Sequence, residues 1–139
     1  MNHRAHMLTT ALAVLAGLGA CAPMDGSPDR ADPALAGPPV RVLGEAQSCV
    51  RIAQIRNTRV RSDQVIDFEL TGGKVYRNVL NSRCPRLGFE RAFTYNTSLN
   101  RLCKPEIIYT LEQRAGSIER GAGCGLGEFV PVEYLASDE

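Results

Sequence analysis

The distribution of cysteines constrains the fold more than any other feature of this chain. Four of the five cysteines, Cys49, Cys84, Cys103 and Cys124, fall in the C-terminal two thirds of the sequence. Their spacings of 35, 19 and 21 residues contain no Cys-x-x-Cys pair, which excludes a thioredoxin-like redox motif and a zinc knuckle. An even number of cysteines pairs into disulfides in an oxidising compartment. Their chemistry therefore depends on where the chain resides.

The N-terminus has the features of a secretory signal peptide. Arg4 supplies a positive charge, and the apolar stretch 7–20 follows it. This stretch is shorter than the ~20 residues that a membrane-spanning helix requires. It ends in Leu18-Gly19-Ala20-Cys21, and an aliphatic residue, two small residues and a cysteine are typical of the site at which bacterial lipoproteins are cleaved and lipidated. We therefore expect residues 1–20 to be a lipoprotein signal peptide and Cys21 to be the lipid attachment site.

The residues around Cys21 also indicate a location. A secreted soluble protein is the alternative, because Ala20-Cys21-Ala22 has the small-x-small pattern of an ordinary cleavage site, but Pro23 suits that peptidase poorly. Ala22 stands where an aspartate would indicate retention in the inner membrane. We expect a protein of the cell envelope, lipid-anchored and facing the periplasm, at the outer membrane. In that oxidising compartment the four remaining cysteines are expected to form two disulfides.

Four cysteines allow three pairings. We expect Cys84–Cys103, which would close one strand and its turn, and Cys49–Cys124, which would join the two ends of the domain. In the loop-entropy model each of these bonds contributes about 3–4 kcal/mol. A Cys₄ zinc site and a redox-active, exchangeable disulfide are the alternatives.

The chain divides into a tether and one domain. Residues 21–46 hold the lipidated cysteine and a segment rich in Pro, Ala, Gly and Asp without apolar periodicity. Such a segment is expected to be disordered and to hold the domain ~25–30 Å from the membrane. The alternative for its end is an edge strand, since Val40 and Val42 follow Pro38-Pro39. Residues 47–139 form the domain.

A β-hairpin is the clearest element of this domain. Residues 65–70 alternate between apolar and polar side chains, Gly72-Gly73 predicts a two-residue turn, and residues 74–80 return. Pro131 makes the last expected strand an edge strand. The other expected elements are strands at 58–61, 89–95, 106–111 and 129–134 and a glycine-rich loop at 114–127. The fold class is therefore mostly β: a small, disulfide-stapled antiparallel meander or barrel of five to six short strands.

The sequence offers little catalytic chemistry. Both histidines, His3 and His6, lie in the leader, so a processed chain contains no histidine base or metal ligand. Asp67 and Glu69 share a strand face ~7 Å apart, a separation that glycosidases use, but the solvated face of a strand explains them as well. We predict no catalytic residue, no metal ligand and no cofactor, and hence no enzyme.

A run of alternating glycines, Gly121-x-Gly123-x-Gly125-x-Gly127, has the look of a phosphate-binding loop. It lacks the strand–turn–helix context that such a loop requires. A loop that accommodates the disulfide at Cys124 is the simpler interpretation.

The charges are distributed unevenly along the chain. The net charge of +1 gives no indication of nucleic acid, but residues 51–104 carry eleven basic and four acidic side chains, and residues 105–139 carry seven acids and two arginines. A basic face would bind an anionic envelope polymer or an envelope protein, unless the two segments pair with each other. The residues expected on this surface are Arg56, Arg59, Arg61, Lys74, Arg77 and Arg91.

Three motifs carry a resemblance to a known family: Gly72-Gly73-Lys74-x-Tyr76-Arg77-Asn78, Cys84-Pro85-x-Leu87 and Cys124-x-Leu126-Gly127. Over residues 49–132 the chain resembles an uncharacterised family of short proteobacterial envelope lipoproteins, a domain of unknown function. The resemblance implies a lipid anchor and a cysteine-stapled domain. It implies no reaction and no ligand.

These observations predict a lipid-anchored, non-enzymatic binding or scaffolding module of the cell envelope. One alternative is a small envelope enzyme or thiol-redox accessory. Another is a chaperone or inhibitor that acts by strand-edge pairing.

Overall fold

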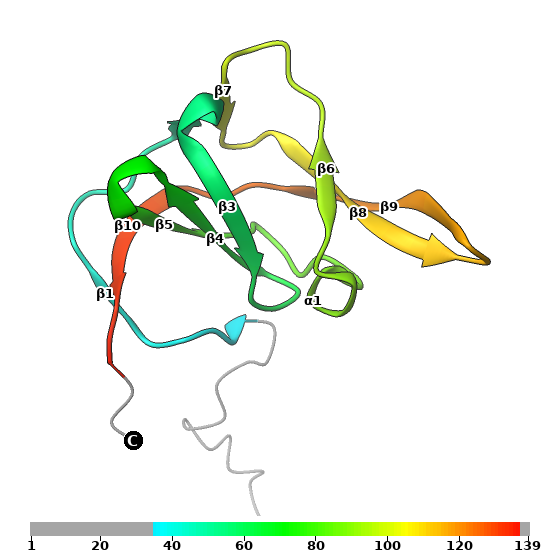
Figure 1. Ribbon diagram of the computed structural model, residues 1–139, viewed down its shortest axis with the longest axis horizontal. Coiled ribbons are helices and arrows are strands. Elements are labelled where there is room, and N and C mark those ends of the chain that lie inside the picture. Colours follow the sequence, from blue (N-terminus) through cyan, green and yellow to red (C-terminus); the bar gives the residue numbers. More distant parts are fainter. Residues whose placement is uncertain (1–34, 137–139) are drawn as a thin grey trace, which may run out of the picture.

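The computed structural model describes residues 35–136; the expected signal peptide, Cys21 and residues 22–34 of the expected tether lie outside this range. Short strands dominate the described chain (Figure 1). The strands are β1 (Val40–Val42), β2 (Cys49–Arg51), β3 (Ile55–Val60), β4 (Val65–Leu70), β5 (Val75–Val79), β6 (Phe93–Tyr95), β7 (Arg101–Cys103), β8 (Ile107–Arg114), β9 (Ser117–Gly125) and β10 (Phe129–Tyr134). The helical elements are α1 (Leu87–Glu90) and the 3₁₀ turns η2 (Ile52–Gln54) and η3 (Thr71–Gly73).

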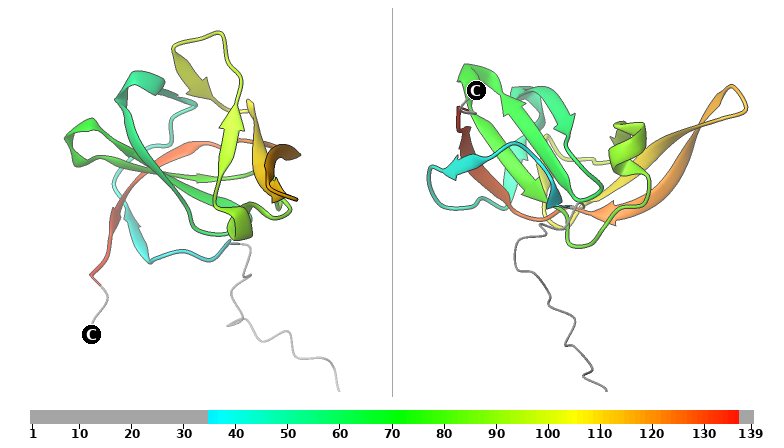
Figure 2. Two further views of the ribbon diagram at one scale, coloured as in Figure 1. Left: turned by 45° about the vertical axis from the view of Figure 1, so that its right-hand side comes forward. Right: turned by 90° about the horizontal axis from the view of Figure 1, so that it is seen from below.

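The strands form three open antiparallel sheets. The largest has the order β1-β10-β5-β4-β3, β6-β8-β9 form a second sheet, and β2-β7 form a short ribbon. The β8–β9 hairpin projects from the body of the domain (Figures 1 and 2). The mostly β, disulfide-stapled fold is confirmed, with more strands in the described chain than the five to six expected.

The β4–β5 hairpin confirms the clearest expectation. β4 pairs with β5 from Val65↔Val79 to Glu69↔Val75. The connecting turn has three residues rather than two, because the Leu70 N–H donates to the Lys74 carbonyl at 2.7 Å. Gly72 and Gly73 both have positive φ angles, of 80° and 76°, which glycine adopts without strain.

The core lies on one face of the large sheet, where it meets the smaller sheets. Phe68 of β4 is fully buried, and its ring packs edge-on against Phe129 at 5.2 Å and Phe93 at 6.3 Å between centroids. Leu102 and Ile108 contribute fully buried side chains from β7 and β8. The apolar half of the β4 alternation therefore points where the pattern predicts.

Two strands at the chain ends differ from expectation. β1 lies inside the segment expected to be a tether and pairs with β10, so the edge-strand alternative for Val40–Val42 is correct and the folded part begins before Gln47. This pairing places β10 inside the sheet rather than at its edge. Pro131 pairs with Tyr76 of β5, but its carbonyl faces the β1 side, where it accepts a hydrogen bond from the Leu43 N–H. The β1 register covers Val132 to Tyr134 only, so the missing N–H of Pro131 falls beyond the end of the β1–β10 ladder.

The run from Gly121 to Gly125 belongs to strand β9 and not to a loop, so that expectation is wrong; Gly127 lies just after the strand. At two of the four glycines, Gly121 and Gly127, a neighbour leaves no room for a side chain. A Cβ on Gly121 would stand 2.0 Å from a carboxylate oxygen of Glu112, and one on Gly127 would stand 2.0 Å from the Val79 carbonyl oxygen. The expected strand at 89–95 is shortened to β6 because α1 takes its first residues.

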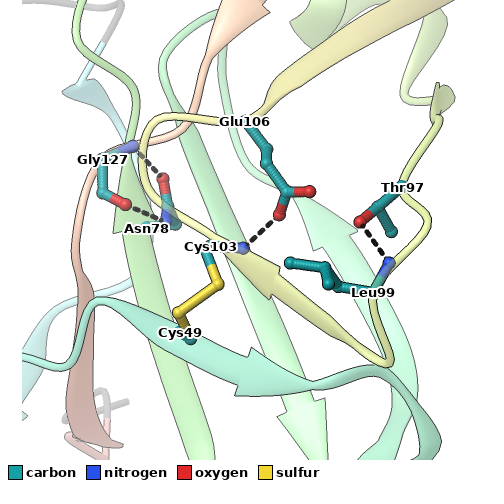
Figure 3. Close-up of a disulfide and its surroundings, with 7 residues drawn as sticks. All are labelled: Cys49, Asn78, Thr97, Leu99, Cys103, Glu106 and Gly127. Atoms are coloured by element: carbon teal, nitrogen blue, oxygen red, sulfur yellow. Dashed lines mark hydrogen bonds between the residues drawn. A yellow bond between two sulfur atoms is a disulfide. The ribbon is translucent and has the colours of Figure 1, made fainter.

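The expected disulfide pairing is also wrong. The bonds are Cys49–Cys103 and Cys84–Cys124. Cys49 and Cys103 lie directly opposite each other in the β2–β7 ribbon, and Figure 3 shows their bond bridging these strands. Cys84 precedes α1 and joins it to β9, where both sulfurs are buried.

Candidate anion-binding site

The register of the large sheet places three of the expected basic residues beside acids. Asp67 of β4 stands between Arg59 of β3 and Arg77 of β5. Arg59 pairs with Glu69, whereas Arg61 and Arg77 both bind Asp67. Acidic side chains of β4 therefore neutralise three of the six basic residues that were expected to form an anion-binding surface.

Asp67 lies at the centre of a polar network inside the domain. The fully buried Asp67 carboxylate accepts hydrogen bonds from Arg61 Nε at 2.8 Å, from Arg77 Nε and a terminal nitrogen at 2.8 and 3.0 Å, and from the Tyr134 hydroxyl at 3.0 Å. Arg61 also donates to the Tyr134 hydroxyl at 2.9 Å. Burial acts to raise the pKa of Asp67, but the hydrogen bonds from Arg77 and Arg61 outweigh it and lower that pKa.

The N-terminal strap, residues 35–39, covers this cluster. Arg77 donates to the Pro38 carbonyl at 3.0 Å, and a Cβ on Gly37 would lie 3.3 Å from the Arg77 guanidinium. The expectation that Asp67 lies on a solvated face is therefore wrong. Arg77 fastens the strap to the sheet, because it binds both the Pro38 carbonyl and the enclosed Asp67 carboxylate. Tyr134 has no sequence signal that points to this role.

A second buried acid stabilises the projecting hairpin. Glu112 of β8 binds Arg114 and lies 3.4 Å from Arg86, and it accepts a hydrogen bond from Thr110 at 3.3 Å. The hydrogen bond from Arg114 lowers the pKa of Glu112. Gly121 on β9 leaves the space that the Glu112 side chain occupies. This network is structural. It explains why residue 121 is a glycine without the need for a phosphate-binding loop.

Two cations without an ion pair, Arg51 and Lys74, lie together at a different place. A polar pocket of about 230 Å³ lies between β2 with η2 and the β4–β5 turn. We call it the cationic pocket; its polar lining residues are Gln47, Arg51, Gln54, Thr71, Lys74 and Tyr76. Lys74 was expected on the basic surface, whereas Arg51 was counted in the basic stretch but not assigned to that surface.

Three cations of this region have no acidic partner. Arg51 and Lys74 are exposed on the pocket wall, and Arg101 of β7 stands directly opposite Arg51. Among residues 35–136, no carboxylate lies within ion-pair distance of any of the three. Like charges directly opposite each other in a ladder are unfavourable, and a bound anion would relieve that repulsion.

The framework of the pocket is held in place on both sides. The Cys49–Cys103 disulfide fixes the register that brings Arg51 and Arg101 together. The Gln47 amide donates to the Tyr76 hydroxyl at 3.2 Å across the pocket floor. Gly72 and Gly73 adopt the positive φ angles of the β4–β5 turn, and Lys74 is the residue directly after this turn. The pocket can therefore offer a guanidinium, an ammonium and amide donors to one anionic group.

The other expected basic residues do not reach this site. Arg56 lies on β3 and Arg91 directly follows α1, and neither lines the pocket. In the described part of the chain, no group of three or more His, Cys, Asp or Glu side chains is arranged to hold a metal ion. None of the described helices is long and apolar enough to cross a membrane.

Comparisons with protein-family models, curated proteins and solved structures find no match for this chain. The resemblance of its motifs to an envelope lipoprotein family stays a prediction.

Proposed function

We propose that this chain is a lipid-anchored protein of the periplasmic face of the outer membrane and a non-enzymatic binding module of the cell envelope. The lipidation pattern ending at Cys21 supports the anchor. The two disulfides support an oxidising compartment, because such bonds persist there and are rare in the cytosol. The anionic partner is an envelope polymer or another envelope ligand that bears phosphate or carboxylate groups.

The cationic pocket is the observation that carries the binding role. Arg51 and Lys74 line it without acidic partners among the described residues, whereas Arg61 and Arg77 are engaged by Asp67. Net charge close to zero does not prevent such a site, because binding depends on local potential and donors rather than on the sum. In the described structure this pocket combines a concave, polar surface with two cations that have no ion pair.

The place of the pocket in the fold suits an anchored module. In Figure 1 the described chain both begins and ends at the lower side of the domain, whereas β7 lies at the upper side. A tether attached to the strap would therefore join the domain at the side opposite the β2–β7 end, so that the anchor would leave this end uncovered. The pocket would then meet its partner in the periplasmic space.

Binding of pyrophosphate tests the pocket. We expect Arg51→Gln and Lys74→Gln each to weaken pyrophosphate binding about tenfold or more, because a charge-assisted hydrogen bond contributes about 1.5–3 kcal/mol. Binding to the native protein should also weaken as ionic strength rises. Titration calorimetry measures both effects. The matched control is Lys104→Gln, whose lysine pairs with Glu128 outside the pocket; an equal loss in the control, or no binding by the native protein, would contradict the proposal.

Lipidation is tested separately. We expect Cys21→Ser to move the protein from the membrane pellet to the soluble fraction or to an uncleaved precursor, and to abolish labelling by a fatty-acid probe. The physical reason is that acyl chains supply the anchoring free energy, at ~0.8 kcal/mol per buried CH₂. Cell fractionation and mass spectrometry of the N-terminal peptide measure the result. Unchanged membrane association and no lipid on the native peptide would refute the anchor.

A further inference from the structure

An apolar groove adjoins the cationic pocket on the other side of the β4–β5 turn. It has a volume of about 520 Å³ and runs between this turn and the β1–β10 strands. Its apolar lining comes from Leu43, Val75, Pro131 and Val132, with the ring of Tyr134. A volume of this size lies within the range of about 300–1,000 Å³ that small-molecule sites occupy.

Lys74 and Tyr76 line both the groove and the cationic pocket. Lys74 therefore lies where an apolar surface meets a polar, positively charged one. Glu133, the acid that lines the groove, is bound by Arg41. The described residues thus leave Lys74 as a cation without a partner at the junction.

The rest of the groove is stably built. Leu43 is 59 % exposed, but its backbone is fixed, because its N–H donates to the Pro131 carbonyl at 2.9 Å. Tyr134 is held by its hydrogen bond to Asp67. Covering an apolar surface that is open to water lowers the free energy of the system, and a surface of fixed shape loses little entropy when a ligand binds.

We propose that the two cavities form one site for a single-chain anionic amphiphile, with the anionic head in the cationic pocket and the alkyl chain in the groove. This inference rests on the proposed function, because it uses the same cations. The pocket of about 230 Å³ is small for a whole ligand and suits a phosphate or carboxylate head, and the groove accepts the chain. The ligand is a monomeric amphiphile rather than a lipid within a bilayer, because the head site and the chain site are both concave.

A series of alkyl phosphates tests this assignment. The protein is the chain from Ala22 onward without lipid, which contains every described residue. We expect the affinity to rise roughly fourfold for each added methylene from butyl to octyl phosphate, all used below their micellar concentrations, until the groove is filled. Octanol, which has the chain but no charge, should bind at least about tenfold more weakly than octyl phosphate.

Two substitutions separate the halves of the site. Lys74→Gln should weaken every alkyl phosphate by a similar factor and leave the dependence on chain length unchanged. Leu43→Ser should reduce that dependence and leave pyrophosphate binding unchanged. Leu99→Ser is the control for Leu43, because Leu99 is 53 % exposed and lies outside the groove.

The possible outcomes distinguish this inference from the proposed function. Pyrophosphate binding that depends on Arg51 and Lys74, with an affinity for alkyl phosphates that does not depend on chain length, would overturn the amphiphile site and leave the binding module intact. Absence of binding for pyrophosphate and for all alkyl phosphates would overturn both. Binding of vesicles that contain phosphatidylglycerol but not of monomeric octyl phosphate would overturn the assignment to a monomeric ligand.

Discussion

Replacing Asp67 with asparagine is expected to lower the free energy of unfolding by about 3–5 kcal/mol, because it leaves buried partners of a carboxylate without their counter-charge. Arg61 and Arg77 both bind this carboxylate, and their side chains are only 23 % and 14 % exposed. The substitution also loosens the strap, since Arg77 holds the Pro38 carbonyl from the same cluster. Urea denaturation followed by circular dichroism measures the change.

Glu69→Gln is the matched control. Glu69 lies on the same strand and pairs with Arg59, which is 54 % exposed. A pair that is open to solvent contributes about 0–1 kcal/mol, so the control should cost much less than Asp67→Asn. Equal costs for the two substitutions would show that burial of the Asp67 cluster does not determine its contribution.

The same cluster predicts a dependence on pH. The pKa of Asp67 is lowered by Arg77 and Arg61 in the folded protein, relative to about 3.9 in an unfolded chain. The unfolded state therefore binds the proton more readily, and the contribution of Asp67 is complete above about pH 4 and is lost as the pH falls through the folded pKa. The stability difference between native protein and Asp67→Asn should shrink over that acidic range. A difference that stays constant down to pH 2 would contradict this origin.

The Asp67 cluster also shows where prediction from sequence ends. The alternation in β4 placed Phe68 in the core correctly, because period two assigns residues to faces of a sheet. It could not show that the second face is covered as well. The covering strap is some thirty residues away and has a composition that resembles a linker, so the burial of Asp67 depends on a contact that no local pattern reports.

The candidate site was predicted in part for a related reason. The basic stretch and Lys74 are recognisable in the sequence. A count of charges, however, does not show which of the cations are neutralised by acidic side chains. That depends on register: β3 and β5 bring Arg61 and Arg77 to Asp67, whereas β7 brings Arg101 to Arg51. The β2–β7 ribbon joins residues about fifty positions apart, and short strands of three residues carry almost no periodicity.

The glycine run illustrates the opposite error. Glycine is unfavourable in strands and common in loops, so residues 114–127 were expected to form a loop. In β9, Gly121 is accepted because the Glu112 side chain occupies the space that a side chain on this residue would need. Gly127 lies just after the strand. Gly127 approaches the β5 backbone closely enough to exchange two hydrogen bonds with the Asn78 side chain, at 2.8 and 2.9 Å (Figure 3). Propensity therefore failed where tertiary packing selects for a missing side chain.

Removal of either disulfide is expected to cause the second large loss of stability. A comparison of the two removals also tests which cysteines are paired. Cys49–Cys103 and Cys84–Cys124 close segments of 54 and 40 residues. In the loop-entropy model each bond contributes about 4 kcal/mol, with a few tenths in favour of the longer loop. Burial reverses this order, because Cys84 and Cys124 are 0 % and 5 % exposed and their removal also leaves a cavity, whereas Cys49 and Cys103 are half-buried.

We therefore expect the double variant Cys84→Ala, Cys124→Ala to lose more stability than Cys49→Ser, Cys103→Ser, although each loses about 2–5 kcal/mol. Urea denaturation without reductant measures both. Non-reducing peptide mapping of the native protein should yield one peptide pair that contains residues 49 and 103 and another that contains 84 and 124. Recovery of pairs 84–103 and 49–124 instead would overturn the β2–β7 register, and with it the framework that places Cys49 and Arg51 on the wall of the cationic pocket.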